Sequence, residues 1–134
     1  MERNQKVEDY MRTIYRLQEN GLVRGAYVAR ELGVSKPTVS VALREMEAEG
    51  YLAIQSDRTI ALTEKGERIG KFVIERNEVI FGLLTDLGVD KRIADADACR
   101  MEHGMSDESL RALIELRHFL RVIRNTYSLD KTDE

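Results

Sequence analysis

Three residues in the second half of the chain, Cys99, Glu102 and His103, have side chains that bind metal ions. On a helix, residues at positions i, i+3 and i+4 project from the same face, so the three donors would lie together. A thiolate, a carboxylate and an imidazole form a mixed ligand set that suits a divalent first-row transition metal. The pattern alone is weak, because a helix surface with a buried cysteine would look the same. The other histidine, His118, is expected to be a surface or packing residue.

A second set of residues has side chains that could contact DNA. The apolar spacing predicts a helix over 26–32 and another over 36–49, with a tight turn at Gly33 between them. Ala29 is small where the two helices must approach, and Val39 is placed to pack the second helix on the first. This spacing is typical of a helix-turn-helix, whose second helix enters the major groove with its N-terminal residues nearest the bases. The candidate DNA-contacting residues of that helix are Ser35, Lys36, Pro37, Thr38, Ser40 and Arg44.

The types of these residues limit what they can recognise. Short hydroxyls and a proline can contact thymine methyl groups and phosphates, but they cannot make the bidentate guanine contact of an arginine. One copy would therefore read DNA with modest specificity, which favours a dimer on a longer site. Arg58 lies in a polar turn between two short alternating segments. It could reach the DNA backbone or the minor groove, or it could be a solvated turn residue.

The elements that would hold these residues are mostly helical, and they form two groups. Three helices followed by a two-stranded β wing predict an N-terminal winged helix-turn-helix over residues 1–71. The remaining helices predict an all-helical metal-binding and dimerisation domain over 72–134, so the expected fold class is mainly α. The polar tail after Tyr127 is expected to be frayed. The expected elements are a first helix with apolar positions from Val7 to Leu17, helices over 26–32 and 36–49, a hairpin over 51–62, a long helix capped by Thr63 and ended by Gly88, and helices over 91–104 and 107–124.

Composition bounds the kinds of protein that this chain could be. Hydrophobic residues make up 43% of its 134 residues, which is enough for a core and too many for a disordered chain. No apolar run is long enough to span a membrane, and no signal-peptide pattern begins the chain. A single cysteine indicates a reducing, cytoplasmic setting. The net charge of −3 does not exclude DNA binding, because residues 1–76 carry 13 basic and 12 acidic side chains and the excess acidity lies beyond them.

Four segments of the sequence resemble one family of bacterial regulators. They are 7–15 (VEDYMRTIY), 34–40 (VSKPTVS), 62–66 (LTEKG) and 97–108 (DACRMEHGMSDE), of which the last is the most specific. Over nearly its whole length the chain resembles the diphtheria-toxin-repressor and manganese-transport-regulator family of metal-dependent repressors. Longer relatives carry a further SH3-like domain, so this chain looks like the two-domain form.

The resemblance implies a ligand set for the activating metal, which consists of Cys99, Glu102, His103 and, near the start of the first helix, Asp9. The iron-responsive branch usually has methionine and cysteine where Asp9 and Cys99 stand, whereas the manganese-responsive branch has aspartate and glutamate. This chain combines a hard oxygen with a soft sulfur, so ligand softness does not choose between Fe²⁺ and Mn²⁺, although the neighbouring residues favour iron. The alternative for Asp9 is a surface ion pair with Arg12.

A second metal position, present in many relatives, is expected to be absent. Arg12, Asn77 and Phe81 stand where relatives have ligand glutamate or histidine side chains. A cation at position 12 would also repel a second divalent ion. We therefore expect one metal ion per subunit.

The resemblance implies a homodimeric repressor that binds double-stranded operator DNA when Fe²⁺ or Mn²⁺ is bound, and that controls genes for metal uptake. A metal joining the two domains would fix the spacing of the recognition helices in the dimer. Two alternatives stay open. One is a winged-helix regulator that no longer senses metal and responds to redox at Cys99 or to nothing. The other is a metalloenzyme built on Cys99, Glu102 and His103, which is disfavoured because no nucleophile–base pair or Gly-rich loop accompanies them.

Overall fold

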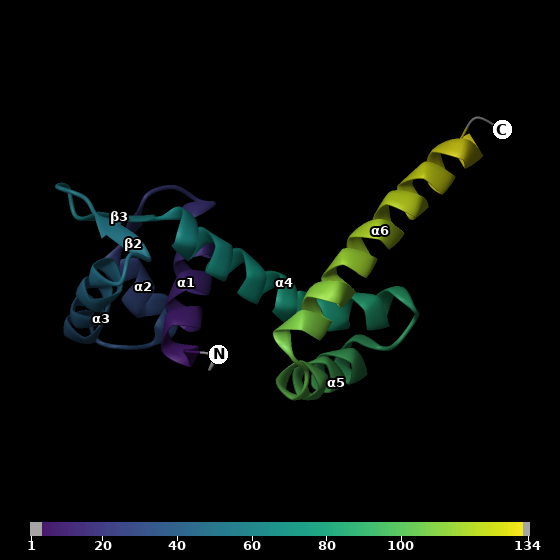
Figure 1. The fold of residues 1–134 in the computed structure, drawn as a ribbon, viewed down its shortest axis with the longest axis horizontal. Helices are drawn as coiled ribbons and strands as arrows, with labels where there is room; N and C mark the ends of the chain where they lie inside the picture. The colour runs from purple at the N-terminus through teal and green to yellow at the C-terminus, as the bar shows by residue number, and fades with distance from the viewer. Residues whose placement is uncertain (1–3, 133–134) are drawn as a thin grey trace. The chain divides into compact units, whose positions relative to one another are not determined.

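The computed structural model describes residues 4–132, and side chains through Tyr127. The chain divides into two compact units, one ending at Ile74 and the other beginning at Glu75, and one helix, α4, runs across the division. Figure 1 shows the elements along the chain. In order they are α1 (Gln5–Gln18), β1 (Val23–Arg24), α2 (Gly25–Leu32), α3 (Lys36–Ala48), β2 (Leu52–Ile54), β3 (Thr59–Leu62), α4 (Glu64–Asp86), α5 (Lys91–Gly104) and α6 (Asp107–Thr132).

The first unit has a core that α1, α2 and α3 share with a small sheet. One face of each helix is apolar and buried, and Ile14 of α1, Val28 of α2 and Val39 of α3 are almost fully enclosed. Each such side chain contributes about 1.5–3 kcal/mol when it leaves water. The shared core therefore fixes α2 and α3 against each other, and the predicted winged helix-turn-helix fold is confirmed.

The sheet has one strand more than the sequence predicted. The expected hairpin is present, with β2 antiparallel to β3 and Ile54 opposite Ile60. On the other side of β3, the two-residue strand β1 pairs Val23 with Ile60 and Arg24 with Thr59. Two residues are too few to show an alternating pattern, so only the burial of Val23 against the core explains this strand.

Local side-chain chemistry sets the ends of the helices that form the helix-turn-helix. Gly33 ends α2 in the left-handed region, with φ of 67°, where a residue with a Cβ is disfavoured. Ser35 caps α3, because its side chain accepts a hydrogen bond from the N–H of Thr38 at 3.3 Å. Thr63 caps α4 in the same way, with the N–H of Gly66 as donor at 3.2 Å. The turn at Gly33 and the cap at Thr63 were predicted from the sequence.

The second unit is helical and has a smaller core. Helix α6 continues to Thr132, past the predicted end at residue 124, because no glycine or proline interrupts it there. None of the helices in the described part of the chain combines the length and apolar character that crossing a bilayer would need. The buried apolar residues of this unit are Val79 and Ile80 of α4, Ala94 and Ala98 of α5, and Leu110 and Ile114 of α6.

Candidate metal centre and DNA-binding surface

Cys99 and His103 lie one turn apart at the end of α5, and both are exposed. Sγ of Cys99 is 4.0 Å from Nδ1 of His103. The same Nδ1 is 2.7 Å from the backbone oxygen of Cys99. A carbonyl oxygen only accepts, so Nδ1 donates to it and carries the proton of the neutral ring. This tautomer leaves a lone pair on Nε2, which is the nitrogen that could bind a metal.

The carboxylate of Glu102 contacts α4 instead. Its Oε1 accepts a hydrogen bond from Nε of Arg76 at 3.2 Å, and the amide nitrogen of Asn77, once its orientation is assigned from this contact, donates to the same carboxylate. The side chains of Arg76 and Glu102 are only 5% and 13% exposed. Arg76 also lies 4.0 Å from Asp107. Breaking a buried ion pair by removing one partner typically costs about 3–5 kcal/mol.

The geometry thus brings together two of the three predicted α5 donors. Among the side chains of residues 4–127, no group of three or more His, Cys, Asp and Glu is arranged to hold a metal. The donor types still fit a divalent transition metal, because a thiol and an imidazole with a free Nε2 lie one helical turn apart and a carboxylate belongs to the same turn. A metal that took Glu102 as a ligand would share or replace its contact with Arg76.

Sequence reasoning missed Arg76, to which it assigned no role. A signal was present in the spacing. Arg76 follows Val73 by three residues and precedes Ile80 by four, so it lies on the buried face of α4. A buried guanidinium needs an anionic partner. The spacing could therefore have predicted a carboxylate facing Arg76, but not which one.

The fourth predicted ligand, Asp9, belongs to the first unit, where its carboxylate has partners on its own helix. Nη2 of Arg12 is 3.5 Å from Oδ1 of Asp9, and Nε2 of Gln5 donates to the same oxygen at 3.0 Å. The ion pair with Arg12 that the sequence offered as an alternative is therefore formed. Both side chains are partly exposed, so the ion pair contributes at most about 1 kcal/mol to stability, and breaking it costs little free energy.

The outer face of α3 carries the predicted DNA-contacting residues. Val39, Ala42 and Leu43 bury the opposite face, which leaves all six candidates exposed. Sequence reasoning missed Val41, whose side chain is 58% exposed between the candidates Ser40 and Arg44. Its spacing from Pro37 places it on the outer face, and an apolar side chain there can contact a thymine methyl group.

The turn of the wing places Arg58 in a conformation that is unusual for its residue type. Its φ is 68°, in the left-handed region. Its N–H donates to the carbonyl of Gln55 at 2.9 Å, and the N–H of Gln55 donates to Thr59 at 2.9 Å, which together close a three-residue hairpin loop. The Thr59 hydroxyl, and then its N–H, donate to Asp57 and hold the pKa of that carboxyl below its usual value. This network fixes the loop, with Arg58 exposed at its end.

Helix α6 carries a stripe of exposed apolar side chains that the core of the second unit does not cover. The residues recur at the spacing of one helix face. A continuous apolar stripe of this kind is typical of a surface that packs against another protein. We name it the α6 stripe, and its members are Leu116, Phe119, Leu120, Ile123 and Tyr127.

Two family profiles match the chain. The profile described as "Iron dependent repressor, N-terminal DNA binding domain" matches residues 4–60. The profile described as "Iron dependent repressor, metal binding and dimerisation domain" matches residues 63–123.

Curated relatives and solved structures agree with this match. The chain is 40% identical over 111 residues to the diphtheria toxin repressor of Corynebacterium glutamicum, which covers 81% of the chain and 49% of that protein. It is 39% identical to the iron-dependent repressor IdeR of Mycobacterium tuberculosis, over 81% of the chain and 48% of that protein. A solved manganese-dependent transcriptional repressor in complex with manganese has a TM-score of 0.62 at 26% identity, over 83% of the chain and 51% of that protein. ScaR with bound Zn²⁺ shares the fold, with a TM-score of 0.68 at 24% identity over 84% of the chain and 54% of that protein.

The chain spans about half the length of the curated relatives that it matches. Within that half, the two profiles follow each other in the order of the winged helix-turn-helix and the helical unit. The chain therefore belongs to the iron-dependent repressor family, which includes the diphtheria toxin repressor.

Proposed function

We propose that the protein is a metal-activated transcriptional repressor that binds operator DNA as a homodimer and controls genes of metal homeostasis. The observation that carries the proposal is the arrangement at the end of α5, where the Cys99 thiol and a His103 ring with its Nε2 free lie one turn apart. They occur in a chain whose other unit has a winged helix-turn-helix with an exposed recognition helix.

The proposed metal site holds one Fe²⁺ or Mn²⁺ ion per subunit. Its ligands are Cys99, Glu102 and His103, together with Asp9, which the family resemblance implies as the fourth ligand. Both carboxylates are paired with arginines, Asp9 with Arg12 and Glu102 with Arg76. Binding a dication therefore exchanges two ion pairs for metal–ligand bonds. A metal with ligands in both units would link them, and thereby favour one spacing of the two recognition helices in the dimer.

The DNA-binding part of the proposal rests on α3 and the wing. Lys36 and Arg44 supply positive charge for phosphates, and the short side chains between them allow the helix to approach the base edges closely. Arg58 adds a cation at the end of the wing. The second copy would pack on the α6 stripe, where large apolar side chains are otherwise left in water.

The proposal is tested by measuring the affinity of the purified protein for promoter DNA with chelator, and then with Fe²⁺, Mn²⁺ or Zn²⁺. We expect the activating metal to raise the affinity by about 5–150-fold, the usual size of an allosteric coupling. Cys99→Ala and Asp9→Ala should each abolish most of this increase. Asp97→Ala is the matched control, since Asp97 is a carboxylate on the same helix that pairs with Arg100 and lies outside the proposed ligand set.

Each result bears on a separate part of the proposal. Equal affinity with and without metal would refute metal activation and favour the regulator that no longer senses metal. A metal response that survives both alanine variants would refute these ligands. More than one tightly bound ion per subunit would contradict the proposed stoichiometry. The metalloenzyme alternative predicts zinc-dependent hydrolysis, which hydrolase assays on the zinc-loaded protein would detect.

A further inference from the structure

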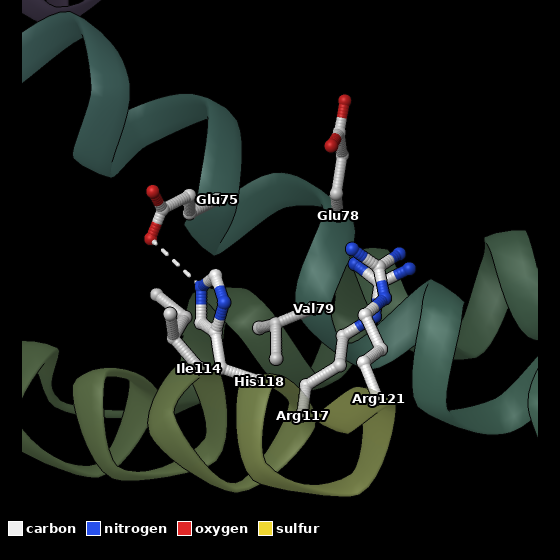
Figure 2. A pocket seen from close by; sticks show the side chains of 7 residues that line it. All are labelled: Glu75, Glu78, Val79, Ile114, Arg117, His118 and Arg121. Atoms are coloured by element: carbon white, nitrogen blue, oxygen red, sulfur yellow. Dashed lines mark ion pairs between the residues drawn. The ribbon is translucent and has the colours of Figure 1, made fainter. Parts of the chain in front are cut away.

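Helices α4 and α6 line a cavity of about 230 Å³ that is partly open to solvent and that the proposed function does not use. Its polar lining comes from Glu75 and Glu78 of α4 and from Arg117, His118 and Arg121 of α6, as Figure 2 shows. The cavity is larger than a few water molecules require. It therefore has room for a small molecule beside the charged groups.

The guanidinium of Arg117 is held in this cavity without an acceptor. Its Nε is buried and has no hydrogen-bond partner within the described part of the chain. The group lies directly over Gly82, where a Cβ would collide with it, so this glycine provides the space that the guanidinium occupies. A buried donor without an acceptor costs free energy, and such a group in a native protein calls for a partner.

Arg121 follows Arg117 by one helical turn, so the two cations are neighbours on α6. Neither of them forms an ion pair or hydrogen bond among the described side chains. The carboxylates that line the cavity do not supply acceptors to these two guanidiniums. Figure 2 shows the Glu75 carboxylate directed to His118, with Oε2 4.0 Å from Nε2, and the Glu78 carboxylate directed away from both guanidiniums.

We propose that this cavity binds a small oxyanion, such as phosphate or a carboxylate, between the guanidiniums of Arg117 and Arg121. Guanidinium groups offer planar pairs of N–H donors that match the oxygens of these anions. An anion there would supply the missing acceptor for Nε of Arg117 and would relieve the repulsion between two like charges one turn apart. It would thereby hold the start of the long exposed part of α6 against α4. This site is separate from the α5 donors and from the DNA-binding surface, so the inference does not depend on the proposed function.

The test is isothermal titration calorimetry of the metal-free full chain with sodium phosphate and with sodium acetate, against sodium chloride at matched ionic strength. We expect saturable binding of one oxyanion per subunit. Arg117→Met and Arg121→Met should each weaken it by about tenfold or more, the usual effect of losing a charged hydrogen bond. Arg92→Met, which removes an exposed arginine of α5 outside the cavity, should change it by less than about twofold.

Gly82→Ala tests the geometry without changing any charge. The added Cβ would displace the flexible end of Arg117, so phosphate binding should weaken although the helix should fold normally, which circular dichroism checks. The stronger of the phosphate and acetate responses would identify the oxyanion class. The proposal would be overturned if neither anion bound more than chloride did. It would also be overturned if Arg117→Met, Arg121→Met and Gly82→Ala all bound phosphate as the parent does, since that would place the phosphate elsewhere on the chain.

Discussion

Replacing Arg58 by glycine separates the backbone cost of the wing turn from the charge that it carries. With φ of 68°, Arg58 adopts a conformation that costs an L residue about 1–2 kcal/mol. Glycine avoids this cost but loses about 0.5–1 kcal/mol more backbone entropy on folding. We therefore expect Arg58→Gly to raise the free energy of unfolding by about 0.5–1 kcal/mol. Arg58→Ala keeps the Cβ, and should leave the stability nearly unchanged.

Both variants remove the same positive charge, so they should have the same effect on DNA binding if Arg58 contacts a phosphate. Each phosphate contact contributes about 0.9 to the slope of log affinity against log salt. The slope should therefore fall by about 0.9 per subunit in both variants. Strained backbone positions of this kind cluster at functional sites.

Stability is measured by urea unfolding at one protein concentration, because a dimer's stability depends on concentration. DNA affinity is measured by fluorescence anisotropy at several salt concentrations. The backbone argument fails if Arg58→Gly is no more stable than Arg58→Ala. The DNA argument fails if the salt slope is unchanged in both, since Arg58 would then be a solvated turn residue.

Three further predictions follow from other parts of the structure. Gly66→Ala places a Cβ against a backbone carbonyl and should destabilise the chain by about 1–3 kcal/mol in urea unfolding. Gly104→Ala adds a Cβ where nothing lies within 4 Å and should stabilise the chain by about 0.5–1 kcal/mol. Equal effects of the two substitutions would contradict the packing around Gly66. Phe119→Glu puts a charge on the α6 stripe, where the side chain is 61% exposed, and should weaken the dimer by at least about thirtyfold in analytical ultracentrifugation without unfolding the subunit. Hydrogen bonds lower the pKa of the Asp57 carboxyl in the folded chain below its value of 3.8 in the unfolded chain. The carboxylate therefore stabilises the fold above pH 3.8, and this contribution is lost as the pH falls through the lower pKa of the folded chain. Asp57→Asn should flatten that part of the acid-unfolding profile.

The sequence was sufficient to predict the features that depend only on residues close together in the chain. The turn at Gly33 and the caps at Ser35 and Thr63 were predictable, because a left-handed glycine and a hydroxyl cap require only residues close by in the chain. The outer face of α3 was predictable for the same reason, although Val41 was not among the predicted residues and its spacing from Pro37 places it on that face.

Features that depend on distant residues were not predictable in this way. Strand β1 exists because Val23 meets Ile60 across 37 positions of the chain, and two residues carry no pattern of their own. The partner of Glu102 is Arg76, which lies 26 residues away in the sequence. The sequence of α5 alone places Glu102 on the same turn as Cys99, but it does not show that the Glu102 carboxylate contacts α4. The ligand set itself stays a prediction that the metal and variant measurements would decide.

The contact between Arg76 and Glu102 has a consequence for the concentration range over which such a protein could respond. If Glu102 is a ligand, the guanidinium acts as an internal competitor that is always present at the same effective concentration. Every 1.4 kcal/mol by which this contact stabilises the metal-free chain would raise the free metal concentration needed for half-saturation about tenfold. A buried arginine that never touches the metal would then tune the set point of the sensor, and natural variation at position 76 would shift that set point without altering a single ligand.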